Sequence, residues 1–171
     1  NKYGVDTPFL RPKKYSSDKS SSASAIKHSL IMSEKFYDKK FDYIIELMNT
    51  NPLKSYNDID NVIKLIIKKK ADSVIAVNQL FDHHPARIKK IKNGRLYDFA
   101  IKEKLESRRQ DLKPQAFIRS GSIYAMSRKF VLNEKRYVSS QSIPYIMKPE
   151  RVINIDTNED LYLAKLKISE K

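Results

Sequence analysis

The chain has 171 residues, no cysteine and a formal net charge of +14 at pH 7. This length suits a single domain with a sizeable core. The lack of cysteine excludes disulfides and thiolate metal sites, and it fits a reducing compartment. No apolar run approaches the ~20 residues of a membrane-spanning helix, and the first residues lack the apolar core of a signal peptide. We therefore expect a cytoplasmic protein with no membrane partner.

The excess of 34 Lys and Arg residues over 20 Asp and Glu residues raises the question of nucleic-acid binding. Most of this excess is Lys spread along the chain, and its two clusters, at 66–73 and 86–95, fall at a helix end and in a loop-like segment. No RNA-recognition, zinc-finger or helix-turn-helix pattern accompanies them. Biased composition together with small anionic ligands is the favoured interpretation, and a basic nucleic-acid-binding module without catalysis is the alternative.

Strand and helix patterns alternate along the first half of the chain. A Ser-rich loop leads into a short helix within 17–30, and apolar runs at 42–48 and 72–77 are typical of buried strands. Between these runs, residues 55–70 carry a helical apolar stripe that comprises Ile59, Val62, Ile63, Ile66 and Ile67. Strand, helix and strand in succession predict a βαβ unit with parallel strands.

Two details support these helices. Ser55 and Asp58 have the spacing of a capping box at the start of the second helix. Ile26 and Leu30, four residues apart in the first helix, would face the core.

The second half begins with a polar, basic stretch over residues 78–118, which we interpret as an insertion or a long excursion. Strands are then expected over 120–126, 144–148 and 152–156. A last helix should cover 157–168, with Thr157 and Asp160 as its capping box. Its inner stripe would consist of Leu161, Ala164 and Ile168.

Polar residues follow three of the expected strands. The segments concerned are 49–54, 78–87 and the acid Asp156. Ligands of open α/β sheets bind at the carboxyl ends of the strands, so these segments are three candidate walls of one cleft.

The adjacent histidines His83 and His84, which follow Asp82, suggest chemistry at first sight. Adjacent side chains diverge in an extended chain, and the third histidine, His28, lies in the first helix. No nearby acid completes the spacing of a zinc motif. We interpret the two histidines as a hinge and partial pocket wall rather than a catalytic centre.

Six segments occur in an order that resembles the acylneuraminate cytidylyltransferases, also called CMP-sialic acid synthetases. They are "LRPKKYSSDKSSSASAIKHSL" (10–30), "NTNPLKSYNDID" (49–60), "ADSVIAV" (71–77), "HHPARIKKI" (83–91), "RRQDLKPQAFIRSGSIYAM" (108–126) and "INIDTNEDLYLAK" (153–165). The likeness covers essentially the whole chain and is nearest to the bacterial branch acting on nonulosonic acids. A cytidylyltransferase for an eight-carbon keto sugar acid is a nearer rival, against which "RRQDL" and "HHPAR" argue.

The resemblance implies a three-layer, Rossmann-like nucleotidyltransferase fold with a mostly parallel mixed sheet, formed by one domain over residues 1–171. It implies that the hydroxyl of a nonulosonic acid attacks the α-phosphorus of CTP in the presence of Mg²⁺, giving a CMP-sugar and pyrophosphate for cell-surface glycans such as lipopolysaccharide. It also implies a homodimer in which the insertion, residues 82–118, lies at the interface.

The resemblance assigns nucleotide-binding roles to Arg11, Ser20, Ser22, Thr50 and Asn51. Family members usually read Gln-Pro-Thr-Ser-Pro-Leu-Arg after the central strand, where this chain reads "MNTNPLK". Met48 therefore replaces a substrate-binding Gln whose hydrogen bonds it cannot make. Asn49 offers an amide one position later, and Lys54 replaces the Arg.

Further substrate-binding roles fall on Arg119 and Ser120, while Arg109 aligns with the family's catalytic arginine and Gln110 lies beside it. Taken alone, "RR" is an ordinary basic surface pair. Tyr124, in the same strand, is expected in the core.

Many members read Asp-Ile-Asp where this chain has Asn154, Ile155 and Asp156. Residues 154 and 156 of a strand share one face, so Asp156 is expected to bind Mg²⁺ and to act in catalysis, while Asn154 offers a neutral oxygen to metal or substrate. An acid favoured by the helix dipole is the alternative reading of Asp156.

The chain has three glycines, and none lies in a phosphate-gripping loop of the kind that opens family members. Compared with family members, we expect about 50–60 residues, including the first strand, to be absent from the start of this chain. The usual range of domain sizes accommodates a domain longer by that amount. We also expect these 171 residues alone to be inactive or very weak as an enzyme. The sequence does not name the sugar.

Overall fold

The computed structural model describes residues 4–17, 20–102 and 108–169. Parts of two predicted regions, the loop at 17–30 and the insertion at 82–118, therefore lie outside the described residues. Four strands form the main sheet in the order β1 (Tyr43–Leu47), β5 (Ala116–Ser127), β2 (Ser73–Leu80) and β6 (Ile143–Ile146). Strand β5 is antiparallel to both β1 and β2, and β6 is parallel to β2.

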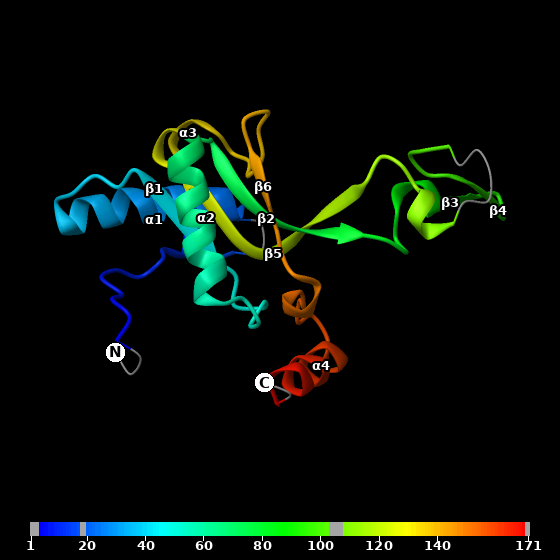
Figure 1. Ribbon diagram of the computed structural model, residues 1–171. Coiled ribbons are helices and arrows are strands. Elements are labelled where there is room, and N and C mark those ends of the chain that lie inside the picture. The colour runs from blue at the N-terminus through cyan, green and yellow to red at the C-terminus, as the bar shows by residue number, and fades with distance from the viewer. Residues whose placement is uncertain (1–3, 18–19, 103–107, 170–171) are drawn as a thin grey trace.

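The two strands of the predicted βαβ unit run in the same direction, as expected, but they are not neighbours in the sheet. Strands β1 and β2 point the same way, joined by α2 (Tyr56–Lys69), but β5 lies between them. The chain leaves β2, passes through a long excursion and returns in the opposite direction, so β5 pairs with β2 on the side that faces β1 (Figure 1). The result is a mixed sheet in which three of the four described strands run in one direction.

Helices cover both faces of this sheet. On one face, α1 (Ser22–Tyr37) and α3 (Arg128–Asn133) pack through Leu30 and Phe130 against β2 and β5. On the other face, α2 packs through Val62 and Ile66, both of which have no exposed surface. This α/β/α layering is the predicted three-layer class, and the apolar contact of two separate clusters with one sheet stabilises it.

The sequence predicts the start of α2 correctly but not the end of α1. Ser55 accepts from the backbone N–H of Asp58 while the Asp58 carboxylate accepts from that of Ser55, which is the predicted capping box. Ile26 and Leu30 of α1 are buried, as expected. Helix α1 runs on to Tyr37, beyond the predicted end at residue 30, because Ile31, Met32 and Phe36 meet no breaker before Asp38 adopts a left-handed conformation.

The last part of the chain departs from the predictions. Helix α4 (Asn158–Ser169) begins at the expected Thr157–Asp160 cap, but only Ala164 of its predicted stripe is buried, and Leu161 and Ile168 are exposed. The buried contact of this helix is a small cluster in which Ala164 packs with Leu53 and Ile153. Its small contact area explains why the full stripe is not buried.

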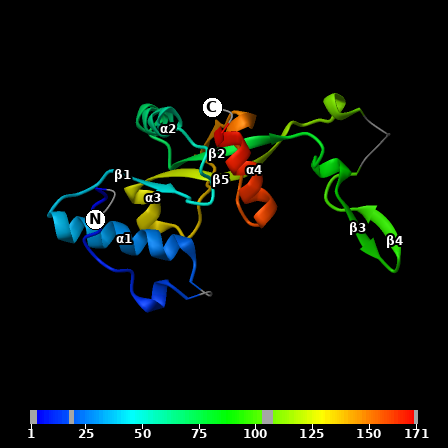
Figure 2. The ribbon, with the colours of Figure 1, turned by 90° about the horizontal axis from the view of Figure 1, so that it is seen from below.

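The outer halves of β2 and β5 pair only with each other and leave the sheet as a two-stranded ribbon. The ribbon ends in an arm that carries the hairpin β3 (Lys89–Lys92) and β4 (Arg95–Asp98), far from the sheet in both views (Figures 1 and 2). Four short 3-10 helices complete the described chain, at Lys13–Tyr15, Pro85–Arg87, Arg109–Asp111 and Pro149–Arg151. Within the part of the chain that the structure describes, no helix is both long and apolar enough to cross a membrane.

Candidate functional site

A cavity of about 570 Å³ opens where β1 and β2 end, and we take it as the candidate site. The loop after β1, the middle of β5 and the segment before α4 all contribute to its wall. The lining residues are Met48, Thr50, Asn78, Ile118, Arg119, Ser120, Gly121, Val152, Asn154 and Asp156. The carboxyl ends of parallel strands are where α/β sheets bind ligands, which favours this cavity on topology as well.

A bulge in β5 brings two of these residues to the cavity. Ile75 of β2 pairs with Tyr124, whereas Val77 pairs with Arg119, so β5 has extra residues opposite Ala76. The Ser120 hydroxyl donates to the Ala76 carbonyl at 3.0 Å and replaces part of the lost ladder. Gly121 has a φ of +65°, a conformation that a side chain strains, so a glycine inside this strand marks the bulge.

Asn51 connects three walls of the cavity from behind. Its side-chain nitrogen donates to the Gly121 carbonyl and to Oδ1 of Asn154, both at 3.0 Å, and only 1% of its surface is exposed. Beside it, the Ile155 N–H donates to the Thr50 carbonyl at 2.9 Å. Asn51 does not line the cavity, so in this geometry it positions the walls; the predicted nucleotide contact stays a prediction.

The prediction of a strand over 152–156 is wrong, but the expectation that Asn154 and Asp156 share one side of the segment is confirmed. After the turn at Pro149 this segment forms no ladder; its backbone contact with the neighbouring loop is the hydrogen bond from Ile155 to Thr50. Asn154 and Asp156 nevertheless both face the cavity, and the Asn154 side-chain nitrogen donates to Oδ2 of Asp156 at 2.5 Å. A side-chain hydrogen bond, and not the alternation of a strand, therefore keeps Asn154 and Asp156 together at the cavity.

Charges of both signs are available at the cavity. Asp156 is the one carboxylate among its described lining residues, and Arg119 is the one cation. Both side chains are exposed, and no ion pair between Arg119 and a described residue is found. An unpaired guanidinium and a carboxylate that line the same cavity suit a ligand that carries an anionic group and a bound cation.

Lys54 closes the loop that follows β1. Its ammonium donates to the carbonyls of Met48 and Asn51, each at 2.6 Å, and burial lowers its pKa. The cation that replaces the family's Arg therefore holds this loop in shape, so that Met48 and Thr50 face the cavity.

A buried ion pair supports the same walls from α2. Asp58 has no exposed surface and accepts from Arg151 at 2.8 Å, from the Tyr145 hydroxyl at 2.9 Å and from Ser55. Burial by itself raises the pKa of Asp58, but the hydrogen bonds from Arg151, Ser55 and Tyr145 outweigh it and lower that pKa to about 2. Arg151 directly precedes Val152, so this pair fixes where the Asn154–Asp156 wall starts.

The remaining predicted site residues lie outside the cavity lining: Arg11, Ser20, Ser22, Asn49, Arg109 and Gln110. Ser20 donates to the Lys14 carbonyl at 2.7 Å, and Ser22 begins α1. Arg109 belongs to the arm, where it pairs with Asp82 at 3.3 Å and lies 5.0 Å above the Phe81 ring. The structure thus separates Arg109 from Asp156, and their shared catalytic role stays a prediction.

His84 is a structural residue at the base of the arm. It is buried; its Nδ1 accepts from the Ala86 N–H, so its Nε2 donates to the Pro114 carbonyl at 2.8 Å. This hydrogen bond joins the segment that enters the arm to the segment that leaves it. No group of three or more His, Cys, Asp or Glu side chains that could hold a metal is found among the described residues.

Sequence reasoning missed four lining residues: Asn78, Ile118, Gly121 and Val152. Gly121 had a usable signal, since a lone glycine in a run of strand formers indicates a bulge. Asn78 lay in the segment flagged as a wall and was not singled out. Ile118 and Val152 are ordinary apolar residues that only the fold brings there.

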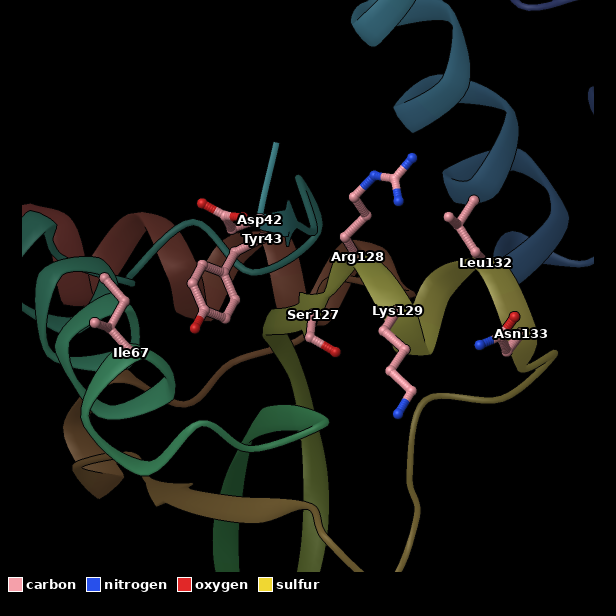
Figure 3. Close-up of a pocket in the computed structure, with 8 residues that line it drawn as sticks. All are labelled: Asp42, Tyr43, Ile67, Ser127, Arg128, Lys129, Leu132 and Asn133. Carbon is pink, nitrogen blue, oxygen red and sulfur yellow. The ribbon is translucent and has the colours of Figure 1, made fainter. Parts of the chain in front are cut away.

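A second cavity, of about 670 Å³, lies at the opposite end of the sheet, where β1 begins and β5 ends (Figure 3). Figure 3 shows Arg128 directed toward α1 and Lys129 directed away from it. The Arg128 guanidinium donates to both carboxylate oxygens of Glu34, at 2.6 and 3.0 Å. Of the two cations that line this cavity, Arg128 is therefore already paired, and we favour the cavity at the strand ends, which topology also supports.

The layered mixed sheet defines a three-layer, Rossmann-like α/β fold. A solved CMP:2-keto-3-deoxy-manno-octonic acid synthetase, complexed with CTP, has this fold, with a TM-score of 0.57 over 90% of this chain and 70% of that one. At 12% identity this likeness concerns the fold alone.

The chain is also similar in sequence to known proteins over nearly its whole length. The chain is 28% and 26% identical to pseudaminic acid cytidylyltransferases from two strains of Campylobacter jejuni, over 96% of this chain and 70% of each relative. It is 22% identical to the post-translational flagellin modification protein B of Campylobacter coli, over 99% of this chain and 71% of that protein. No family model matches. The relatives confirm the resemblance to cytidylyltransferases of nonulosonic acids.

Proposed function

We propose that this chain binds CTP and a nonulosonic acid and serves the transfer of CMP to that acid, with release of pyrophosphate. The carrying observation is the cavity at the strand ends, with Arg119 and Asp156 facing it, in a chain whose relatives are cytidylyltransferases. Such a transfer requires two anionic substrates to be held in line and charge on phosphorus to be stabilised. One cation and one carboxylate, neither of them in an ion pair with a described residue, line a single cavity and fit that requirement.

Each side chain has a distinct part in this proposal. Arg119 binds the carboxylate of the sugar acid or a phosphate oxygen through its planar fork. Asp156 holds Mg²⁺ together with phosphate oxygens and water, which is the usual manner of Mg²⁺ binding and needs one or two carboxylates. When bound, the ion neutralises phosphate charge. Oδ1 of Asn154 already accepts from Asn51, so Asp156 carries more of the metal binding than Asn154.

We place the reaction in the cytoplasm, where CTP is available, and its product in cell-surface glycan synthesis. The roles of Arg11, Ser20 and Ser22 with the nucleotide, and those of Arg109 and Gln110 in catalysis, belong to the same proposal. They require the arm or the N-terminal segment to approach a bound substrate.

A direct test is thermal unfolding of the chain with CTP and Mg²⁺. Saturating CTP with Mg²⁺ should raise the melting temperature by several degrees, since each kcal/mol of binding energy raises it by about 2–4 °C in a domain of this size. ATP at the same concentration should raise it less. No response to CTP, together with salt-sensitive binding of arbitrary single-stranded RNA, would instead favour a nucleic-acid-binding module.

The arm is the surface through which we propose that two copies associate. Ile91 and Leu96 are opposite each other in the hairpin, and 77% and 71% of their surfaces are exposed. Tyr97 and Phe99 are exposed beside them. Exposed apolar side chains on a hairpin held away from the body gain stability when a second copy covers them.

Ile91→Asp should therefore convert a dimer into a monomer, because a carboxylate would be buried without a partner. Sedimentation equilibrium measures the mass of each species. Ile67→Asp, which changes an exposed isoleucine of α2, is the matched control and should leave the dimer intact. A monomeric wild type, or equal effects of the two substitutions, would contradict the arm as the interface.

A further inference from the structure

Three hydrogen-bonded side chains lead from the protein interior to the carboxylate of Asp156. The first is Asn51, which is only 1% exposed and whose side-chain nitrogen donates to Oδ1 of Asn154 at 3.0 Å. The side-chain nitrogen of Asn154 donates in turn to Oδ2 of Asp156 at 2.5 Å. Asn154 and Asp156 are both exposed at the cavity, whereas Asn51 lies behind its wall. A buried amide is thus connected to an exposed carboxylate through a second amide.

The two ends of this chain of hydrogen bonds determine how both amides are oriented. One end is the Gly121 carbonyl, which accepts from the Asn51 nitrogen at 3.0 Å, and the other end is the Asp156 carboxylate. Both ends are acceptors, so each amide must direct its nitrogen outward along the chain. A flip of Asn51 or Asn154 would place oxygen against oxygen. Oδ1 of Asn51 is buried without a partner among the described residues, and the two hydrogen bonds that its nitrogen donates offset that cost.

This orientation decides what Asn154 presents to a cation. Its oxygen is directed toward the buried Asn51, and its N–H group is directed toward Asp156. A hard cation such as Mg²⁺ binds oxygen and is repelled by an N–H donor. Asn154 is therefore badly oriented to share a cation with Asp156 while Asn51 holds it in this way.

The same contact prepares Asp156. Its Oδ2 accepts from Asn154, while no hydrogen bond from a described residue to its Oδ1 is found. A carboxylate at position 154 would instead bring two negative oxygens together and would need a cation between them. The amide at 154 holds Asp156 in place without a cation and leaves Oδ1 open to the cavity.

We propose that Asn154 is a positioning residue and not a ligand of Mg²⁺. Asn51 sets the orientation of the Asn154 amide, and this amide holds Oδ2 of Asp156 so that Oδ1 is presented to the ion. The inference rests on the proposed function and adds how this chain orients its metal-binding carboxylate. If Asn154 were a ligand, loss of Asn51 would release its oxygen for the ion, so the two roles predict opposite effects of replacing Asn51.

Isothermal titration with CTP, with and without Mg²⁺, separates the two roles. The quantity to compare is the factor by which Mg²⁺ tightens the binding of CTP. Asn154→Ala and Asn51→Ala should each lower this factor by about tenfold, since partners that orient metal ligands are worth about 10–100-fold. A change in the shape of the cavity alone would weaken binding with and without Mg²⁺ alike and would leave the factor unchanged.

Three further variants sharpen the comparison. The double variant should lose no more of the factor than the single variants, because both substitutions break the same chain of hydrogen bonds. Asn51→Ser returns a hydroxyl donor on a shorter side chain and should regain part of the factor that Asn51→Ala loses. Asn158→Ala, at an exposed asparagine that begins α4, is the control and should keep the factor.

Carbon NMR of the wild type gives a second measurement that does not depend on the folding of Asn51 variants. Addition of Mg²⁺ to the complex with CTP should shift the Cγ signal of Asp156 more than that of Asn154. A ligand role for Asn154 predicts that its own Cγ signal shifts at least as much. Asp156→Asn and Asn154→Ala assign the two signals.

The outcomes separate the two levels of the proposal. The positioning role is wrong, while the binding of CTP and Mg²⁺ stands, if either alanine variant keeps or raises the factor or if the losses of the double variant are additive. It is equally wrong if Asn51→Ser regains nothing or if the Asn154 signal shifts as much as that of Asp156. If CTP does not bind, or if Mg²⁺ does not tighten its binding to the wild type, the proposed function itself fails and this inference fails with it.

Discussion

Asp156→Asn is expected to weaken binding of CTP in the presence of Mg²⁺ by at least about tenfold, because outer-shell partners of metal sites alone are worth 10–100-fold. The substitution keeps a side-chain oxygen where the Asn154 nitrogen donates, so the wall itself should stay in place. What is lost is the negative charge that a hard cation requires. Isothermal titration with CTP, with and without Mg²⁺, measures the effect.

Glu159→Gln is the matched control for that experiment. It removes one negative charge three residues away, from an exposed side chain in the first turn of α4. If Asp156 holds the metal, only Asp156→Asn should lose the Mg²⁺-dependent part of the affinity, and binding without Mg²⁺ should be the same in all three proteins. Equal losses of affinity in both variants would mean that any negative charge near the start of α4 has the same effect, and would contradict the binding of Mg²⁺ by Asp156.

The parts of the fold that follow from local pattern could be predicted. The stripe of α2 recurs at helical spacing, and its cap at Ser55 and Asp58 depends on residues three apart, so both are visible in a short window. The same holds for the start of α4 at Thr157. The predicted stripe of α4 was wrong at Leu161 and Ile168, which are 40% and 54% exposed. Periodicity does not show whether a partner distant in sequence will cover a stripe.

Strand order and the bulge could not be predicted. Periodicity identifies β1 and β2 but does not say that β5, which follows a long arm, pairs between them. The four-residue bulge opposite Ala76 then sets which β5 residues face the cavity. Arg119 and Ser120 were chosen by resemblance to a family, and the bulge is the physical reason that Gly121 lies beside them.

The sequence predicted only in part which residues come together at the cavity. Residues that directly follow strands, such as Met48 and Thr50, reach the cavity by topology alone. Arg109 does not, because its position depends on the course of the arm, which no local rule fixes. Asn51 shows the opposite case, since a residue expected to touch ligand is almost fully buried and connects the walls instead.

The support beneath those walls leads to the largest expected effect on stability. Asp58→Ala should lower the free energy of unfolding by about 3–5 kcal/mol, the usual cost of removing one partner from a buried ion pair. Arg151 would remain largely buried without its carboxylate, and the Tyr145 hydroxyl would lose its acceptor. Because Arg151 precedes the Asn154–Asp156 wall, the variant should also bind CTP more weakly under conditions where it is folded. Urea unfolding at pH 7 measures the change in the free energy of unfolding.

The pH dependence distinguishes a lost ion pair from a general packing defect. The folded-state pKa of Asp58 is about 2 and lies below its ordinary value of 3.8, so its stabilisation is present above about pH 4 and is lost as the pH falls toward 2. The wild type should therefore lose more stability than Asp58→Ala over that window. Asp60→Ala, an exposed acid in the same helix, should follow the wild-type curve. Parallel curves for the wild type and Asp58→Ala would mean that the carboxylate stabilises the wall by packing and not by its charge.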